Sequence, residues 1–243
     1  MNRRRFALIS NGLKIMKMML TLASSVLWIV LAPSVFALEI SWPLTQTTSA
    51  ETPDGFSVEA IQSDPPGHPL FLGRPAPQAG VKGFQPALQD GALVFGPNTT
   101  AFAAEFWKNF KDFGFEVELK FDTVELDQTV LRVSGSWELR LAANEGRPAL
   151  QFIGFREGLK AVDVSLEGIE AGKTYSLQGR MQADGTMTLE SSDGESYTAS
   201  LGQPPAEWVD FPDFYVGSSN PRAALRPFLG TISRLQFRAE EAP

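Results

Sequence analysis

The sequence predicts an all-β protein built as an antiparallel β-sandwich, and two observations carry that prediction. Residues 115–121 alternate strictly between apolar and charged side chains, and one face of this stretch holds Phe115, Val117, Leu119 and Phe121. A half-buried antiparallel strand needs this pattern, whereas a parallel strand covered on both faces does not show it. Short strands of the same kind then recur between Gly-containing turns, which is typical of a sandwich or a barrel.

The first 37 residues have the features of a secretory signal peptide. Basic residues at positions 3–5, 14 and 17 precede an apolar run over residues 18–32, and the segment ends in Val35-Phe36-Ala37. This arrangement predicts export with cleavage after Ala37, and hence a periplasmic or extracellular protein. The alternative is an uncleaved membrane anchor, because residues 18–37 are barely long enough to span a bilayer.

The composition of the chain limits the classes of partner and of chemistry that are possible. The formal net charge is −7, and removal of a signal peptide with five basic and no acidic residues lowers it to −12. We therefore expect no binding to nucleic acid, and membrane contact only through an uncleaved signal segment. The chain has no cysteine, which excludes disulfides, thiolate catalysis and cysteine-zinc sites. Its one histidine, His68, lies in a Pro- and Gly-rich stretch and is expected to be an exposed loop residue.

Residues 38–83 are expected to form a Pro- and Gly-rich lead segment that packs on a sandwich domain spanning residues 84–243. Within the segment, residues 56–61 alternate as a strand does, and residues 38–44 could add a second strand at a sheet edge. The five prolines and four glycines of residues 64–83 predict a long irregular connection between the lead strands and the domain.

The sandwich domain has the pattern of many short strands. These are expected at residues 93–95, 115–121, 130–133, 137–141, 150–155, 162–167, 175–181, 187–189, 197–201 and 214–216. Ahead of the clearest strand, four aromatic side chains recur at helical spacing, which predicts one or two helical turns over residues 106–113.

The end of the chain, residues 211–237, organises the expected fold. A strand ends at Gly217, a polar loop follows, and a closing strand starts at Gly230. The apolar positions of the closing strand are separated by three residues and then by two, which predicts a β-bulge near residues 233–234.

This ending resembles that of laminin-G-like domains in the concanavalin A-like lectin/glucanase superfamily. Residues 172–190, an aromatic strand followed by an Asp-Gly hairpin, resemble another part of the same domains. The resemblance covers about residues 84–238 and implies a jelly-roll sandwich of two antiparallel sheets. It implies no single function, because this fold hosts lectins, glycosidases, lyases and adhesion modules.

One branch of that superfamily hydrolyses polysaccharides with an E-x-D-x-E or E-x-D-x-x-E motif, in which two glutamates flank the glycosidic bond. Glu125-Leu126-Asp127 matches the first half, but Thr129 and Val130 stand where the second glutamate belongs. A single carboxylate cannot be both nucleophile and proton donor. The sequence therefore favours a protein that is not an enzyme.

Calcium is the candidate cofactor. Asp122, Glu125 and Asp127 crowd one loop between two expected strands, and carboxylate oxygens at the rim of a sandwich are ligands that Ca²⁺ prefers. The resemblance implies the same, since laminin-G-like domains often hold calcium at such a rim. The spacing matches no fixed calcium-loop motif, so an ordinary acidic loop is the alternative.

The candidate ligand-binding residues lie late in the chain. Trp208 lies in a Pro-containing loop, where an exposed ring could stack on a sugar, whereas Trp137 shares a face with the leucines that follow it and is expected in the core. Asn220, Arg222 and Arg226 lie in one loop, and its arginines could bind a carboxylated glycan or an acidic partner. A solvated loop is the alternative interpretation.

These features together predict an exported, non-catalytic binding module that recognises a glycan or the surface of an extracellular or envelope protein. A polysaccharide-active enzyme of the same fold and a structural envelope protein are the alternatives. Two carboxylates that converge in a concave cleft would favour the enzyme, because a binding module needs none.

Overall fold

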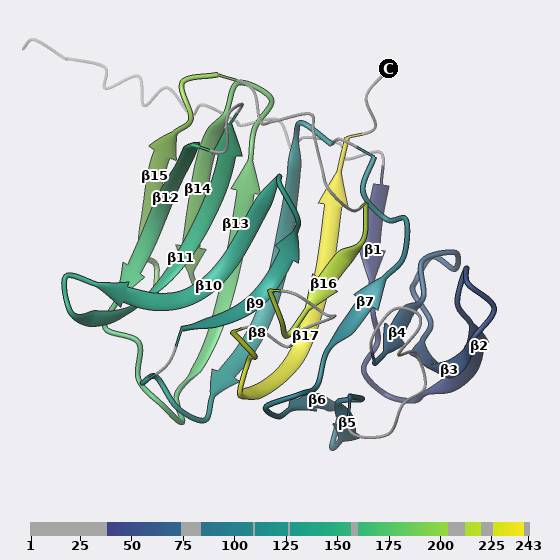
Figure 1. The fold of residues 1–243 in the computed structure, drawn as a ribbon. Coiled ribbons are helices and arrows are strands. Elements are labelled where there is room, and N and C mark those ends of the chain that lie inside the picture. The colour runs from purple at the N-terminus through teal and green to yellow at the C-terminus, as the bar shows by residue number, and fades with distance from the viewer. Residues whose placement is uncertain are drawn as a thin grey trace, which may run out of the picture. The chain divides into compact units, whose positions relative to one another are not determined.

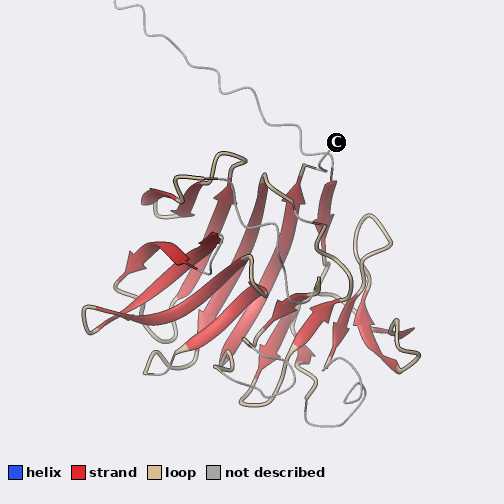
Figure 2. Cartoon of the chain, turned by 45° about the horizontal axis from the view of Figure 1, so that its top comes forward, coloured by secondary structure: helices blue, strands red, loops and turns tan. Residues whose placement is uncertain are grey.

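A computed structural model describes residues 38–73, 84–108, 110–125, 127–156, 160–203, 212–219 and 226–240. They all belong to one structural unit, Val35–Pro243. The other unit, Met1–Ser34, lies outside the described residues, and so does the predicted cleavage site after Ala37. The described ranges consist of strands, turns and loops (Figure 2), and they include no helix with the length and apolar character that a membrane crossing requires.

The described strands form two antiparallel sheets that pack as a sandwich (Figure 1). The eight-stranded sheet has the order β15-β14-β13-β8-β17-β6-β5, with β1 also paired to β17. Its strands are β1 (Leu38–Ser41), β5 (Ala87–Gln89), β6 (Ala92–Phe95), β8 (Phe113–Phe121), β13 (Thr174–Met181), β14 (Thr186–Ser191), β15 (Ser196–Ser200) and β17 (Gly230–Ala239).

The nine-stranded sheet has the order β12-β11-β10-β9-β16-β7-β4-β3-β2. Its strands are β2 (Thr48–Glu51), β3 (Ser57–Ile61), β4 (Leu70–Leu72), β7 (Ala101–Ala103), β9 (Gln128–Val133), β10 (Trp137–Asn144), β11 (Arg147–Arg156), β12 (Lys160–Glu167) and β16 (Phe214–Val216). Neighbours in this sheet are often far apart in sequence, as β16 between β9 and β7 shows. The fold is therefore an all-β sandwich, which confirms the predicted class.

The core lies between the two sheets, and the alternation in β8 builds one wall of it. All four of its apolar side chains from Phe115 to Phe121 are buried, while the intervening charged side chains are partly exposed. From the facing sheet, the Trp137 ring stacks on the Phe115 ring, with the centroids 5.3 Å apart and the planes 5° from parallel. The predicted register of β8 and the core position of Trp137 are both confirmed.

The strand β17, yellow in Figure 1, binds the eight-stranded sheet together. One of its sides pairs with β8 along its length, and the other pairs first with β6 and then with β1. The register shifts between Ile232 and Arg234, which confirms the predicted bulge. At Gly230 a Cβ atom would overlap the carbonyl oxygen of Lys120 on β8. A glycine is needed at this position because another backbone approaches it closely.

The aromatic residues ahead of β8 form no helix, which corrects the predicted helical turns over residues 106–113. The Trp107 amide donates a hydrogen bond to the Pro212 carbonyl, 2.7 Å away, and Phe113 already begins β8. An irregular segment can bury every third residue as a helix does, so the aromatic spacing did not require a helix. Buried there are Phe106, Trp107 and Phe110.

The lead segment is part of the sheets. It supplies β1 to the eight-stranded sheet and β2, β3 and β4 to an edge of the nine-stranded sheet. The strand β4 corrects the expectation of a long irregular connection at residues 70–72, while residues 74–83 of the expected range 64–83 lie outside the described residues. Leu70 and Leu72 pack in the core between the sheets, and Phe71 packs in a second apolar cluster on the opposite face. A strand covered on both faces has no alternation to reveal it.

Candidate functional site

Arg226 is the predicted ligand-binding residue that the structure describes; Trp208, Asn220 and Arg222 lie outside the described residues. It comes four residues before β17 and has a φ of +50°, a left-handed conformation that is uncommon for a residue other than glycine. Its carbonyl accepts a hydrogen bond from the Thr129 amide, 2.9 Å away. Its guanidinium Nη2 lies 3.3 Å from Oε1 and 3.4 Å from Oε2 of Glu138.

Glu138 is the buried acid at the centre of this group, with 2% of its side chain exposed. It is the second residue of β10, so its side chain points away from the core that Trp137 fills. The Thr129 hydroxyl donates to Oε1 at 2.6 Å, and Nη1 of Arg132 lies 3.6 Å from Oε2. Thr129, Arg132, Glu138 and Arg226 are called the Glu138 patch below.

Strand pairing explains how the Glu138 patch forms. The turn at residues 134–136 joins β9 to β10 and places Arg132 directly opposite Glu138. The bulge between Leu139 and Arg140 shifts the register by one residue and brings Thr129 to the same face. Arg226 then arrives from a loop 88 residues further along the chain. The patch thus combines a local hairpin with one distant residue.

The electrostatics of the patch are unbalanced. Two guanidinium groups share one carboxylate, and Nε of Arg132 is buried without a hydrogen-bond acceptor. A buried donor that lacks an acceptor costs free energy, about 1–3 kcal/mol by mutational data. The donors open to an anion are the terminal nitrogens of the two guanidinium groups, whose side chains are 21% and 30% exposed.

Polar contacts continue from the patch across the sheet. Nε of Arg140 donates to the Gln151 side chain at 3.0 Å, and the Gln151 amide reaches Asp163 at 3.5 Å. The hydroxyl of Ser165 also donates to Asp163, at 2.8 Å. Register pairing puts Arg140, Gln151 and Ser165 in one row on the outer face of β10, β11 and β12. The outer face here is a polar surface built on regular strands.

The same face is apolar on the other side of the patch. Register pairing links Arg132 to Tyr215, Tyr215 to Phe102, and Phe102 to Phe71. These aromatic side chains belong to the second apolar cluster and are buried. The character of the outer face therefore changes at the boundary between β16 and β9, where the Glu138 patch begins.

A depression of about 380 Å³ lies near the far end of β10. It is lined by Val124, Glu125, Asp127, Ala142, Ala143, Gly146 and Pro148. Two of the three predicted calcium ligands, Glu125 and Asp127, thus share a depression, whereas Asp122 does not line it and is exposed. Within the ranges that the structure describes, no group of three or more His, Asp or Glu side chains is arranged to hold a metal ion.

His68 differs from the exposed loop residue that the sequence predicts. It is half-buried, with its ring in an edge contact with Phe106 at a centroid distance of 5.5 Å, and its carbonyl accepts a hydrogen bond from the Trp42 indole at 2.8 Å. Burial, and secondarily the charge of Lys108, lower the pKa of His68 below 6.5. The neutral form is therefore favoured in the folded protein.

Sequence reasoning missed Arg132 and Glu138, although a signal was present. A three-residue hairpin loop at Ser134-Gly135-Ser136 pairs residue 132 with residue 138, as the structure has it. An Arg–Glu pair across such a hairpin is a predictable contact. The contribution of Arg226 had no comparable signal, because it depends on how distant strands are ordered.

Comparison with known proteins supports the fold. No protein-family model and no curated protein matches the chain. The binding domain of botulinum neurotoxin serotype D is 10% identical with a TM-score of 0.52, covering 83% of this chain and 50% of that one. The receptor-binding domain of botulinum neurotoxin type G is 9% identical with a TM-score of 0.51, covering 86% and 48%.

Domains LG4-5 of the mouse laminin α1 chain are also similar, at 16% identity and a TM-score of 0.46, covering 59% of this chain and 40% of that one. The matched region is thus at most half of each of these three structures. Identities this low show a shared fold alone, and the two toxin domains carry that likeness.

Proposed function

We propose that this chain is an exported, non-catalytic binding module of the laminin-G-like type, which recognises a glycan or a protein surface through the Glu138 patch. The observation that carries the proposal is Arg226. It combines a left-handed backbone conformation with a guanidinium over a buried acid that Arg132 already contacts. Backbone strain of this kind concentrates at ligand-binding positions, because it fixes a side chain in a geometry that function requires.

The test is a binding screen of the purified full chain on a glycan array and on extracts of envelope proteins, with Arg226→Ala beside the parent. The matched control is Arg234→Ala, since Arg234 also pairs with a glutamate but on the outer face of the other sheet. Loss of binding in Arg226→Ala alone supports the proposal. A chain that binds nothing, or equal binding by both variants, contradicts it and favours a structural envelope protein.

Two further expectations belong to the same proposal. Export with cleavage after Ala37 is checked by N-terminal sequencing of secreted material, and an intact Met1 would contradict it. Calcium binding through Asp122, Glu125 and Asp127 is checked by repeating the array with a chelator. A calcium-dependent module loses binding under the chelator, whereas unchanged binding shows that calcium does not contribute.

A polysaccharide-active enzyme is the second candidate, because Glu125 and Asp127 line the same depression. Such an enzyme needs two carboxylates in the roles of acid and nucleophile or base. We expect no release of reducing ends from polysaccharides by the purified chain. Release that Asp127→Asn abolishes would establish the enzyme instead.

A further inference from the structure

Together with Arg226, the outer-face rows that cross the Glu138 patch carry more positive than negative charge. The two outer-face rows that cross β9 to β12, together with Arg226, contain three arginines and two acids: Arg132, Arg140, Arg226, Glu138 and Asp163. Asp163 is engaged by Gln151 and Ser165, on the side of Arg140. The surplus therefore falls on Arg132 and Arg226, which divide one carboxylate between them.

The contacts that these two arginines make are long. The nitrogen–oxygen distances to Glu138 are 3.3, 3.4 and 3.6 Å, whereas charge-assisted hydrogen bonds between such groups are typically about 2.7–2.9 Å. The short bond at the carboxylate comes from the neutral Thr129 hydroxyl, at 2.6 Å. Thr129 thus holds Glu138 in place, and neither arginine forms a short hydrogen bond with its carboxylate.

From this geometry we propose that the patch binds the carboxylate of an acidic sugar, with Glu138 acting as an internal competitor that sets the affinity. The inference rests on the proposed function and names its ligand class. A ligand carboxylate accepts hydrogen bonds from the terminal guanidinium nitrogens of Arg226 and Arg132, whose side chains are 30% and 21% exposed. Glu138 keeps its bond from Thr129 and opposes the ligand by its own negative charge.

The chemistry around the patch favours a sugar over an acidic protein. Beside the patch lie the amide of Gln151, the hydroxyl of Ser165 and the carboxylate of Asp163, and such groups bind sugar hydroxyls. Protein interfaces are anchored by large apolar side chains at their centre. In the described part of the chain, the exposed large apolar residues are Phe56 and Tyr197, and they lie next to β3 and in β15, away from the patch.

The experiment measures binding of the purified full chain to uronic-acid and sialic-acid oligosaccharides, each beside its carboxyl methyl ester. Esterification removes the charge and keeps the sugar, so it isolates the carboxylate. We expect the acid forms to bind about ten- to a hundredfold more tightly than the esters, as one charge-assisted interaction provides. Arg226→Gln should remove this preference, while Arg234→Gln on the other sheet should retain it.

The variant Glu138→Gln tests whether the Glu138 carboxylate competes with the ligand for the arginines or only supports the structure. It keeps the size of the side chain and removes the competing charge, so binding of the acid forms should become tighter and binding of the esters should not change. Circular dichroism and the denaturation midpoint establish that the variant is folded, and Glu138→Asp, which keeps the charge, should show no gain in affinity. Weaker binding of the acid by a folded Glu138→Gln would overturn the inference.

Three other outcomes also decide the matter. Equal binding of acids and esters refutes the carboxylate site. Binding of neutral glycans or of a protein that Arg226→Gln abolishes refutes the inference and leaves the proposed function standing. Binding that neither Arg226→Gln nor Glu138→Gln alters refutes both.

Discussion

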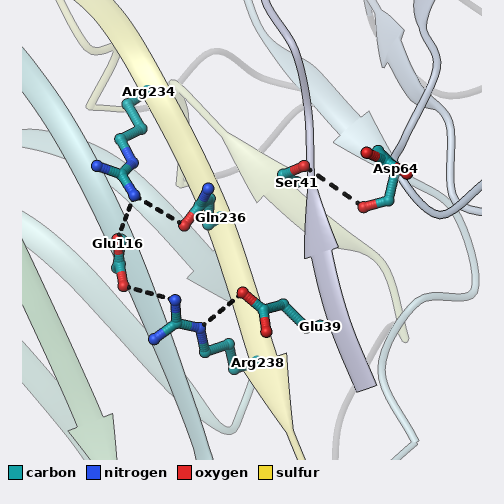
Figure 3. A network of polar contacts seen from close by, with 7 residues as sticks. All are labelled: Glu39, Ser41, Asp64, Glu116, Arg234, Gln236 and Arg238. Atoms are coloured by element: carbon teal, nitrogen blue, oxygen red, sulfur yellow. Dashed lines mark hydrogen bonds and ion pairs between the residues drawn. The ribbon is translucent and has the colours of Figure 1, made fainter.

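The outer faces of the two sheets each carry a glutamate flanked by two arginines, and the two clusters differ in burial and in charge balance. On the eight-stranded sheet, Glu116 is bound by Arg234 at 2.8 Å and by Arg238 at 3.0 Å (Figure 3). Arg238 also pairs with Glu39 at 3.2 Å, and Arg234 donates to Gln236 at 3.1 Å. These residues, the Glu116 network, contain two positive and two negative charges.

The Glu138 patch has the opposite properties. Its carboxylate is 2% exposed, compared with 13% for Glu116, yet its arginine contacts are longer and its positive charges outnumber its acid. Surface ion pairs with good geometry and balanced charge stabilise a fold slightly, and that role is enough to explain them. A buried acid with loose, surplus cations is poorly explained by stability alone. The comparison indicates a structural role for one cluster and a binding role for the other.

The largest expected loss of stability is at Gly230, which lies in the chain between the residues of the two clusters. Gly230 follows the Arg226 loop and begins the strand that carries Arg234 and Arg238. Gly230→Val should destabilise the protein by about 3–5 kcal/mol, because its Cβ would overlap the Lys120 carbonyl oxygen. Chemical denaturation measures this. Thr231→Val, one residue later, is the control and should shift the midpoint little; an unchanged midpoint for Gly230→Val would contradict the close approach.

The next largest loss of stability is expected on the inner face of β8. It gives a reference for the smaller losses expected on the outer faces of the sheets. Leu119→Ala removes a fully buried side chain and should cost about 2–5 kcal/mol, whereas Glu118→Ala on the outer face should stay within about 0.5 kcal/mol. Denaturant midpoints of the two variants check this. Similar midpoints would show that the alternation of β8 does not separate core from surface.

The two glutamates themselves give the direct comparison. Glu138→Ala leaves two arginines, 21% and 30% exposed, without their acid and should cost about 2–4 kcal/mol of unfolding free energy. Glu116→Ala leaves better-solvated arginines that keep other partners, so it should cost about 1 kcal/mol or less. The comparison breaks down if Glu116→Ala is the more destabilising variant.

The smallest effect is the pH dependence due to His68. Burial lowers the pKa of His68 in the folded chain below the ordinary value of 6.5, so the unfolded chain takes up the proton first as the pH falls. This contribution to stability is complete above pH 6.5 and is lost as the pH falls from there to the folded pKa. Unfolding measured across this range should show that His68→Gln removes the slope, while a slope that persists in His68→Gln belongs to other groups.

Several features of this fold were readable from local sequence. The strict alternation from Phe115 to Phe121 gave the register of β8, and the spacing after Ile232 gave the bulge in β17. Part of the Glu138 patch could be predicted from the sequence, since the hairpin turn at residues 134–136 pairs Arg132 with Glu138. Patterns succeed where a structure depends on residues that are close in the chain, because strand geometry and turns relate such residues directly.

Predictions failed where burial on two faces or irregular backbone removes the periodic signal. The strand β4 packs Leu70 and Leu72 into the main core and Phe71 into the second cluster, so its sequence shows no alternation. The buried aromatics of residues 106–113 follow helical spacing without a helix. In both cases the neighbours that cover the segment come from distant parts of the chain, and local propensity cannot report them.

The sequence by itself determined the all-β class, the register of β8 and the need for glycine at position 230. Only the tertiary structure decided that β16 lies between β7 and β9, and that the loop before β17 places Arg226 over Glu138. The physical reason is that side-chain alternation specifies which face of a strand is buried but not which strand lies beside it. The order of strands follows from packing the whole core, and the charge imbalance of the Glu138 patch follows from that order.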